Sequence, residues 1–154
     1  MTTPGAAVLL VCRANLCRSP MAEAVFRACA PALGLARVAS AGVHAAPRGE
    51  PMDPRARAAL ERRRYGVDKK WRSRRVLPED LAKFDRVLAL DSYVLDELRE
   101  LWPGVPAHRV HLLLDHLPGM EGEDVPDPYY SSAIGFDVAL DLIETAVAAF
   151  KLNR

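Results

Sequence analysis

The sequence predicts an α/β fold in which helices cover both faces of a parallel β-sheet. Short apolar stretches alternate with longer helical ones along the chain, which is the order that βαβ units produce. Parallel strands are joined by crossovers, and these place the helices over the sheet. The 154 residues contain no internal repeat, low-complexity tract or linker. We therefore expect a single domain over residues 1–154, large enough to bury its own core.

This alternation assigns four strands and four helices. The predicted strands are the apolar segments 7–12, 37–41, 85–90 and 109–114. The predicted helices are the segments 19–33, 54–65, 92–101 and 132–150. In parallel sheets of this kind, ligands gather at the carboxyl ends of the strands. We therefore expect a ligand-binding site at the end of the first predicted strand.

The first and last predicted helices have further signals. The first helix has an apolar stripe at Met21, Ala24, Val25, Ala28 and Leu33. Gly34 follows at the position expected for a C-cap. Ser131 or Ser132 can cap the last helix. The apolar face of that helix comprises Phe136, Leu140, Ile143, Val147 and Phe150.

Charge is balanced overall but uneven along the chain. The net charge is +1, yet residues 55–75 hold ten Lys or Arg against two acids, and residues 115–144 hold eight acids and no Lys or Arg. A basic cluster can bind nucleic acid or steer anionic substrates. No aromatic platform or nucleic-acid motif accompanies it. We therefore predict a solvated helix face, with substrate steering as the alternative and no nucleic-acid partner.

Compartment and membrane association follow from simple counts. No segment approaches the roughly 18 consecutive apolar residues that span a bilayer. The first residues show neither the charged nor the apolar region of a secretory signal. Three cysteines are too few for a disulfide framework, and their number is odd. We expect a cytoplasmic protein with free thiols and no membrane insertion.

The main chemical signal is the spacing C-x5-R-S, from Cys12 to Arg18 and Ser19, at a predicted strand-to-helix turn. Five intervening residues can curl so that their N–H groups point at an oxyanion, with the thiol below and the guanidinium on the rim. The helix that follows adds free N–H groups and a positive dipole end, which favour phosphate and a thiolate. A lone cysteine is more often structural, but that interpretation leaves the spacing, the Ser-Pro helix start and the strand unexplained.

A second element, Asp127-Pro128-Tyr129-Tyr130, follows late in the chain. With both motifs in this order, the sequence resembles the low-molecular-weight protein tyrosine phosphatases of bacterial type over nearly its whole length. The resemblance implies a four-stranded sheet with a phosphate-binding loop after the first strand. It also implies hydrolysis of phosphotyrosine and aryl phosphates without a cofactor.

Phosphoryl transfer to sulfur needs a thiolate, donors for the phosphoryl oxygens and a proton for the leaving group. The resemblance makes Cys12 the nucleophile that forms a phosphocysteine. Arg18 grips two phosphoryl oxygens in a bidentate geometry that lysine cannot offer. Asp127 protonates the departing phenolate and then activates water, while Pro128 restricts it to extended conformations.

The remaining loop residues receive supporting roles. The phosphate-binding loop comprises, besides Cys12 and Arg18, residues Arg13, Ala14, Asn15, Leu16, Cys17 and Ser19. Ser19 is placed to donate a hydrogen bond to the thiolate; it can also cap the helix. Asn15 tolerates a positive φ, and the resemblance makes it a brace of the loop in contact with Ser40.

Tyr129 and Tyr130 are implied as walls of the substrate pocket, although tyrosines in general are more often half-buried packing. Many relatives carry a large aromatic residue in a variable loop that packs against the substrate. This chain has Ala45 and Ala46 there, and His44 is the only ring nearby. We therefore assign His44 to the substrate pocket and expect one side of it to be open.

The sequence also departs from the family in the residues expected to support the phosphate-binding loop. Relatives often have a histidine before Arg-x-Arg that pairs with an aspartate matching Asp91. Here Trp71 precedes Arg72-Ser73-Arg74, so the supporting network must be built differently.

Cys17 is the predicted redox partner. In the family, a second loop thiol can form a reversible disulfide with the nucleophile and protect it from irreversible oxidation. Cys29 is expected to lie in the core. The four histidines lack metal-ligand spacing, so no metal is predicted. The expected partner is a phosphotyrosine-containing protein, with an autophosphorylating bacterial tyrosine kinase as the candidate that the resemblance suggests.

Two other functions are compatible with parts of this pattern. Thioredoxin-coupled arsenate reductases share this loop but need two further cysteines, and no cysteine follows Cys29. A phosphotyrosine-binding module without turnover is expected to lack Cys12 or Asp127, and both are present. Both functions are therefore disfavoured.

Overall fold

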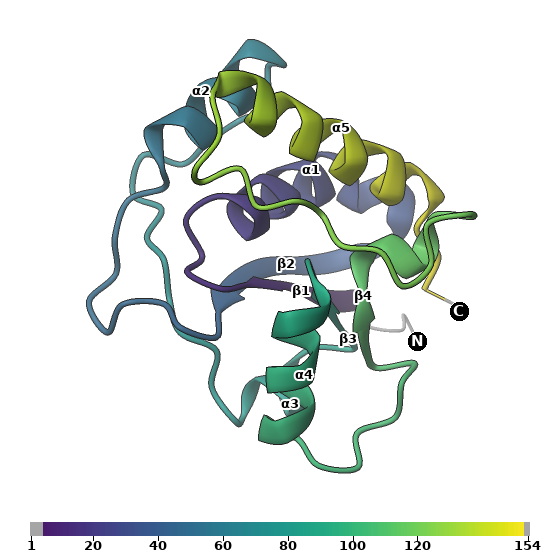
Figure 1. The fold of residues 1–154 in the computed structure, drawn as a ribbon. Helices are drawn as coiled ribbons and strands as arrows, with labels where there is room; N and C mark the ends of the chain where they lie inside the picture. Colours follow the sequence, from purple (N-terminus) through teal and green to yellow (C-terminus); the bar gives the residue numbers. More distant parts are fainter. Residues whose placement is uncertain (1–4, 153–154) are drawn as a thin grey trace.

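One parallel four-stranded sheet, in the order β2-β1-β3-β4, forms the centre of the molecule in a computed structural model that describes residues 5–152 (Figure 1). Residues 1–4 and 153–154 of the predicted domain lie outside the described residues. The strands are β1 (Ala6–Cys12), β2 (Leu35–Gly42), β3 (Arg86–Ala89) and β4 (Val110–Leu112). The helices are α1 (Arg18–Leu33), α2 (Pro54–Arg62), α3 (Asp80–Lys83), α4 (Ser92–Leu101), the 3-10 helix η1 (Leu113–His116) and α5 (Ala133–Ala149).

Helices cover both faces of the sheet, as predicted (Figure 1). Successive side chains of a strand point to opposite faces, and β1 is apolar on both. Val8 and Leu10 pack in a core with residues of α1, α2 and α5, whereas Leu9 and Val11 pack with residues of α4. Because β1 lies between two strands and two helical layers, its carboxyl end at Cys12 is held rigidly.

The predicted boundaries need several corrections. Strand β4 stops at Leu112, because the next four residues curl into η1. Helix α2 ends at Arg62, and Arg64 soon after has the left-handed φ of 65°. The four-residue helices α3 and η1 are missing from the prediction, because one turn is too short to show a period.

Burial along α1 differs from the predicted stripe. Met21 and Val25 are buried, but Ala28 is exposed and Phe26 takes a core position instead. Gly34 does end the helix in the left-handed conformation, with a φ of 71°. Cys29, expected in the core, is only half-buried at its edge.

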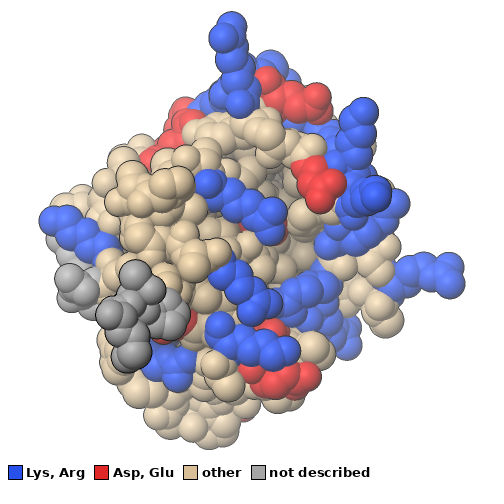
Figure 2. Space-filling model, turned by 180° about the vertical axis from the view of Figure 1, so that it is seen from behind, with Lys and Arg blue, Asp and Glu red and all other residues tan. Residues whose placement is uncertain are grey.

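The basic cluster is not a solvated helix face throughout. Arg62 ion-pairs with Asp137 at 3.3 Å, and Arg63 reaches Asp141 at 2.8 Å and Glu144 at 2.5 Å. The basic end of α2 is thus joined to the acidic face of α5. The remaining cations of the cluster lie mainly in the loops after α2, and Lys and Arg outnumber Asp and Glu on the face seen in Figure 2.

Candidate active site

The phosphate-binding loop joins the end of β1 to the start of α1. Cys12 is the last residue of β1, and Arg18 is the first of α1. Both are nearly buried, with 3% and 4% of their surfaces exposed. The loop between them ends at the N-terminus of a 16-residue helix, whose first N–H groups lack intrahelical partners. Positive charge from Arg18 and from the helix dipole therefore lies beside the Cys12 thiol.

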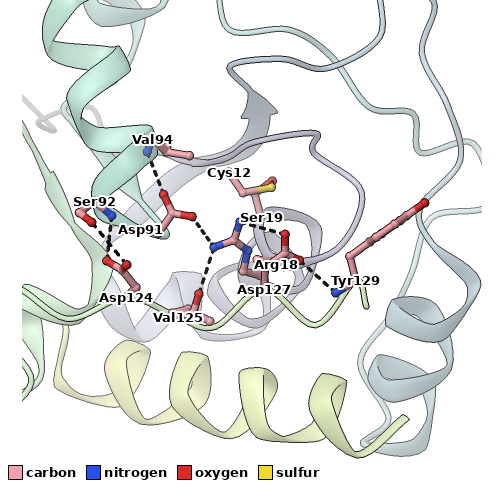
Figure 3. Close-up of polar contacts among 10 residues, drawn as sticks. All are labelled: Cys12, Arg18, Ser19, Asp91, Ser92, Val94, Asp124, Val125, Asp127 and Tyr129. Atoms are coloured by element: carbon pink, nitrogen blue, oxygen red, sulfur yellow. Dashed lines mark hydrogen bonds and ion pairs between the residues drawn. The ribbon is translucent and has the colours of Figure 1, made fainter. Parts of the chain in front are cut away.

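A buried chain of hydrogen bonds supports Cys12 from below. Asn15 has a φ of 60°, and its amide nitrogen donates to Ser19 Oγ at 2.7 Å and to Ser40 Oγ at 3.0 Å. Its amide oxygen accepts from the N–H of Arg74 at 2.9 Å, which fixes the orientation of the amide. Since Ser19 Oγ accepts from Asn15, its own hydrogen is available to Cys12 Sγ, 2.9 Å away (Figure 3).

The far end of this chain shows how the support is built without the family's histidine. Ser40 donates to Glu23 Oε1 at 2.5 Å, and the Trp71 indole N–H donates to the same oxygen at 3.1 Å. Arg27 pairs with the other oxygen of Glu23 at 2.9 Å. Trp71 therefore contributes a neutral donor, while the counter-charge of the buried carboxylate comes from Arg27.

Arg18 is held in place by groups of the opposite charge. Its Nη1 donates to Asp91 Oδ2 at 2.7 Å and to the carbonyl oxygen of Val125 at 3.0 Å (Figure 3). Burial lowers the pKa of Arg18, but neighbouring Cys12 and Asp91 more than offset this and raise the pKa above its ordinary value. A guanidinium held in this way presents its other nitrogens to a phosphoryl group.

Asp127 lies on the opposite side of the loop from the sheet and faces Arg18. Its Oδ2 is 3.7 Å from Arg18 Nη2, and its Oδ1 accepts from the N–H of Tyr129 at 3.1 Å (Figure 3). Its side chain is 48% exposed, so it can exchange protons with water. The fold thus brings together two sequence motifs whose residues Arg18 and Asp127 are 109 positions apart.

The segment before Asp127 is anchored to the turn between β3 and α4. Val125 N–H donates to the carbonyl of Leu90 at 2.9 Å, and Asp124 accepts from the N–H of Ser92 at 2.8 Å. Neither anchor was predicted, because single contacts between distant residues leave no pattern in the sequence. The contact between Arg18 and Asp91 was not predicted either, but the place of Asp91 directly after a predicted strand is a signal that could have indicated it.

Most of the predicted site residues line one pocket, with a volume of about 420 Å³. Its lining consists of Cys12, Arg13, Ala14, Leu16, Cys17, Arg18, Asp127, Tyr129 and Tyr130. Asn15 and Ser19 lie buried beside it, where Ser19 contacts Cys12 and Asn15 contacts Ser19. The structure does not bring His44 into this lining: His44 hydrogen-bonds to Glu97 at 2.8 Å instead.

Cys17 shares the pocket with Cys12, and both are free thiols. Burial, Asp53, Cys12 and Asp127 raise the pKa of Cys17 to about 12. Cys17 therefore stays protonated at neutral pH. Within residues 5–152, no group of three or more His, Cys, Asp or Glu side chains is arranged to hold a metal ion. In the same part of the chain, no helix is long and apolar enough to cross a membrane.

Comparisons with known proteins agree on one family. A family model described as low molecular weight phosphotyrosine protein phosphatase matches residues 7–153. A low molecular weight protein-tyrosine-phosphatase of Streptomyces coelicolor is 41% identical over 145 residues, which cover 90% of this chain and 87% of that protein. The crystal structure of YfkJ from Bacillus subtilis has a TM-score of 0.86 and 34% identity, and the match covers 97% of this chain and 94% of that one. The YwlE arginine phosphatase from Geobacillus stearothermophilus has a TM-score of 0.82 and 29% identity, covering 94% and 89%.

Proposed function

Because the chain belongs to the low molecular weight phosphotyrosine protein phosphatase family and is a protein-tyrosine phosphatase, we propose that it hydrolyses phosphotyrosine through a phosphocysteine on Cys12. The observation that carries the proposal is the convergence of Cys12, Arg18 and Asp127 on one pocket. They come from three separate elements, and each supplies one requirement of phosphoryl transfer to sulfur.

In the first step, the Cys12 thiolate attacks phosphorus while the bond from phosphorus to the phenolic oxygen breaks. Arg18 and the loop N–H groups bind the phosphoryl oxygens, on which charge accumulates. Asp127 gives its proton to the departing oxygen. Ser19, whose hydrogen is available to Cys12 Sγ at 2.9 Å, stabilises the sulfur as the leaving group of the next step.

In the second step, Asp127 removes a proton from water, and the oxygen attacks phosphorus. The phosphorus–sulfur bond breaks, which regenerates the thiolate and releases phosphate. Exposure of Asp127 on one side supports this step, because water can reach the carboxylate.

Hydrolysis of p-nitrophenyl phosphate in EDTA near pH 6 tests this assignment. Replacement of the nucleophile in Cys12→Ser is expected to lower kcat by at least about 10⁴-fold. Unchanged hydrolysis in this variant would contradict the assignment. Full activity of the wild type in EDTA is expected, since no step uses a metal.

The pocket suits an aryl phosphate better than a phosphorylated guanidinium. Leu16, Tyr129 and Tyr130 supply apolar and aromatic surface, and Asp127 is the one carboxylate in the lining. The guanidinium of a phosphoarginine in the same place would have no acidic partner in the pocket lining besides Asp127. A phosphotyrosine peptide is therefore expected to exceed a matched phosphoarginine peptide in kcat/KM, and the reverse order would place the activity with that of YwlE.

The redox proposal rests on the presence of both free thiols in one pocket. Peroxide oxidises the Cys12 thiolate to a sulfenic acid with loss of hydroxide from the peroxide. Cys17 then attacks that sulfur, loses its proton and releases water, which leaves a disulfide. A thiol reductant restores both thiols.

Recovery after peroxide treatment tests the role of Cys17. Wild type treated with peroxide and then reductant is expected to regain most of its own untreated activity. Cys17→Ser, normalised in the same way, is expected to regain much less, because its sulfenic acid proceeds to irreversible acids. Equal recovery in both would remove Cys17 from this role.

The substrate is then a phosphotyrosine-containing protein, and a bacterial tyrosine kinase is the partner we propose from the family resemblance. Three free thiols support a location in the reducing cytoplasm.

A further inference from the structure

Large apolar side chains are exposed mainly in one short segment next to the pocket. Tyr129 is 47% exposed, Tyr130 96%, Ile134 72% and Val138 48%. Three other large apolar residues of the described chain are exposed outside this segment: Leu77, Leu101 and Tyr93, whose ring centre lies 5.9 Å from the guanidinium of Arg13 at the pocket. Single exposed residues need no explanation, whereas a group of them marks an interaction site.

The spacing of this group places it on one side of the molecule. Ile134 and Val138 are four residues apart within α5, and residues spaced by four lie one above the other on a helix. Tyr130 lies in the turn before α5 and joins the two to the wall of the pocket. We call Tyr130, Ile134 and Val138 the α5 ridge.

The α5 ridge is continuous with the wall of the pocket. Tyr129 and Tyr130 line the pocket, and their rings contact each other edge to face with centroids 4.9 Å apart. The segment folds tightly back onto α5 at Gly135: a Cβ there would lie 2.0 Å from Ser131 Oγ. In Figure 1, the segment that precedes α5 runs beneath this helix and enters its first turn beside α2.

A hydrogen bond from α2 fixes the turn that precedes α5. Arg55 donates to the carbonyl of Ser131 at 3.1 Å, and its guanidinium lies 5.6 Å from the centre of the Tyr129 ring. The turn between Tyr129 and α5 is therefore tied to α2, which keeps the ridge next to the pocket wall.

Charges near the ridge are already paired within the protein. Asp137 and Asp141, which flank Val138 along α5, form ion pairs with Arg62 and Arg63. A partner gains little from placing a charge there and loses the hydration of that charge. The chemistry that fits the ridge is an uncharged apolar side chain.

We propose that the α5 ridge is the docking surface for the protein substrate, and that it selects apolar residues beside the phosphotyrosine. The Cα atoms of Ile134 and Val138 are about 6 Å apart, since a helix rises 1.5 Å per residue. Side chains two positions apart on an extended strand share a face and lie about 6–7 Å apart. An extended substrate segment with apolar side chains at two alternate positions therefore matches the ridge. This inference rests on the proposed function.

The rates of hydrolysis of phosphotyrosine peptides test this docking surface. The peptides carry leucine or aspartate at two alternate positions on either side of the phosphotyrosine. Wild type is expected to prefer leucine on one side by on the order of tenfold in kcat/KM, the size of one or two apolar contacts. Ile134→Ser and Val138→Ser are each expected to remove most of this preference relative to hydrolysis of p-nitrophenyl phosphate. Leu77→Ser, which removes an apolar residue elsewhere that is 43% exposed, close to the 48% of Val138, is expected to keep it.

The affinities of the same peptides for Cys12→Ser measure this preference without turnover. Failure of wild type to hydrolyse p-nitrophenyl phosphate would count against the proposed function, whereas equal affinity of Cys12→Ser for leucine and aspartate peptides would overturn the docking surface. Sedimentation of wild type and Ile134→Ser tests whether the ridge instead binds a second copy of this chain. A dimer that Ile134→Ser abolishes, together with unchanged peptide preference, would also overturn the proposal.

Discussion

At the scale of single residues, each reactive group is oriented by a partner far away in the chain. Arg18 is held by Asp91 and by the carbonyl of Val125, and Asp127 lies 3.7 Å from the same guanidinium. Asp127 is also the one carboxylate among the described residues that line the pocket, which supports its proposed role as the acid.

Asp127→Asn is expected to slow the first chemical step according to the leaving group. A phenolate with a high pKa needs the proton most, so kcat/KM for phenyl phosphate, which reports the steps up to formation of the phosphocysteine, should fall by about 10²- to 10³-fold. The fall for p-nitrophenyl phosphate should be smaller, because its leaving group is stable without a proton. Asp68→Asn, on an exposed loop, is the matched control and should leave both rates unchanged. Equal losses for both substrates in Asp127→Asn would show that another group is the acid.

At the scale of elements, the loop after β1 keeps its shape because β2 lies against it. The last residue of β2, Gly42, is paired with Cys12, and His44 N–H donates to the carbonyl of Arg13 at 2.8 Å. A Cβ on Gly42 would lie 2.7 Å from the carbonyl oxygen of Arg13 and 2.8 Å from the nitrogen of Asn15. Both atoms belong to backbone, so neither can move without changing the loop.

Gly42→Ala is therefore expected to lower both stability and activity. Overpacking of this kind costs about 1–3 kcal/mol in the free energy of unfolding, and displaced N–H groups should weaken inhibition by inorganic phosphate about tenfold or more. Gly66→Ala is the matched control, since no atom lies within 4 Å of its Cβ position. Urea unfolding and the inhibition constant for phosphate measure the two effects. Loss of stability with unchanged phosphate binding would mean that β2 does not shape the loop.

At the scale of the whole molecule, folding keeps two acidic groups protonated far above their ordinary range. Burial and nearby Asp53 raise the pKa of Cys17 from 9.0 to about 12. Burial and the hydrogen bond to Glu144 raise the pKa of Tyr65 from 10.0 to about 12. The unfolded chain releases the Cys17 proton above pH 9 and the Tyr65 proton above pH 10, while the folded chain retains both, so the folded state loses stability as pH rises from 9 toward 12.

The free energy of unfolding in reductant is accordingly expected to fall between pH 8 and pH 10.5. Cys17 contributes on the order of 1 kcal/mol per pH unit to this slope once its unfolded pKa is passed. Cys17→Ser has no group to titrate there, so its stability should decline less steeply, whatever its value at pH 8. Parallel curves for the two proteins would contradict the raised pKa.

By itself, the sequence determined the class of fold, the order of the main helices and strands, and the three residues assigned to the chemistry. These depend on local causes: apolar periodicity sets each element, and the spacing from Cys12 to Arg18 sets the length of the phosphate-binding loop. The positive φ of Asn15 and its contact with Ser40 also match the prediction, whereas its contact with Ser19 was not predicted.

Only the tertiary structure decided how these parts meet. It turned His44 toward Glu97, joined Trp71 to Glu23, and tied the segment before Asp127 to the start of α4. It also left the α5 ridge uncovered next to the pocket. The physical reason is that such contacts link residues 30 to 50 or more positions apart, through single hydrogen bonds or unmatched surfaces. No local periodicity encodes them, and they exist only once the sheet and both helical layers have formed.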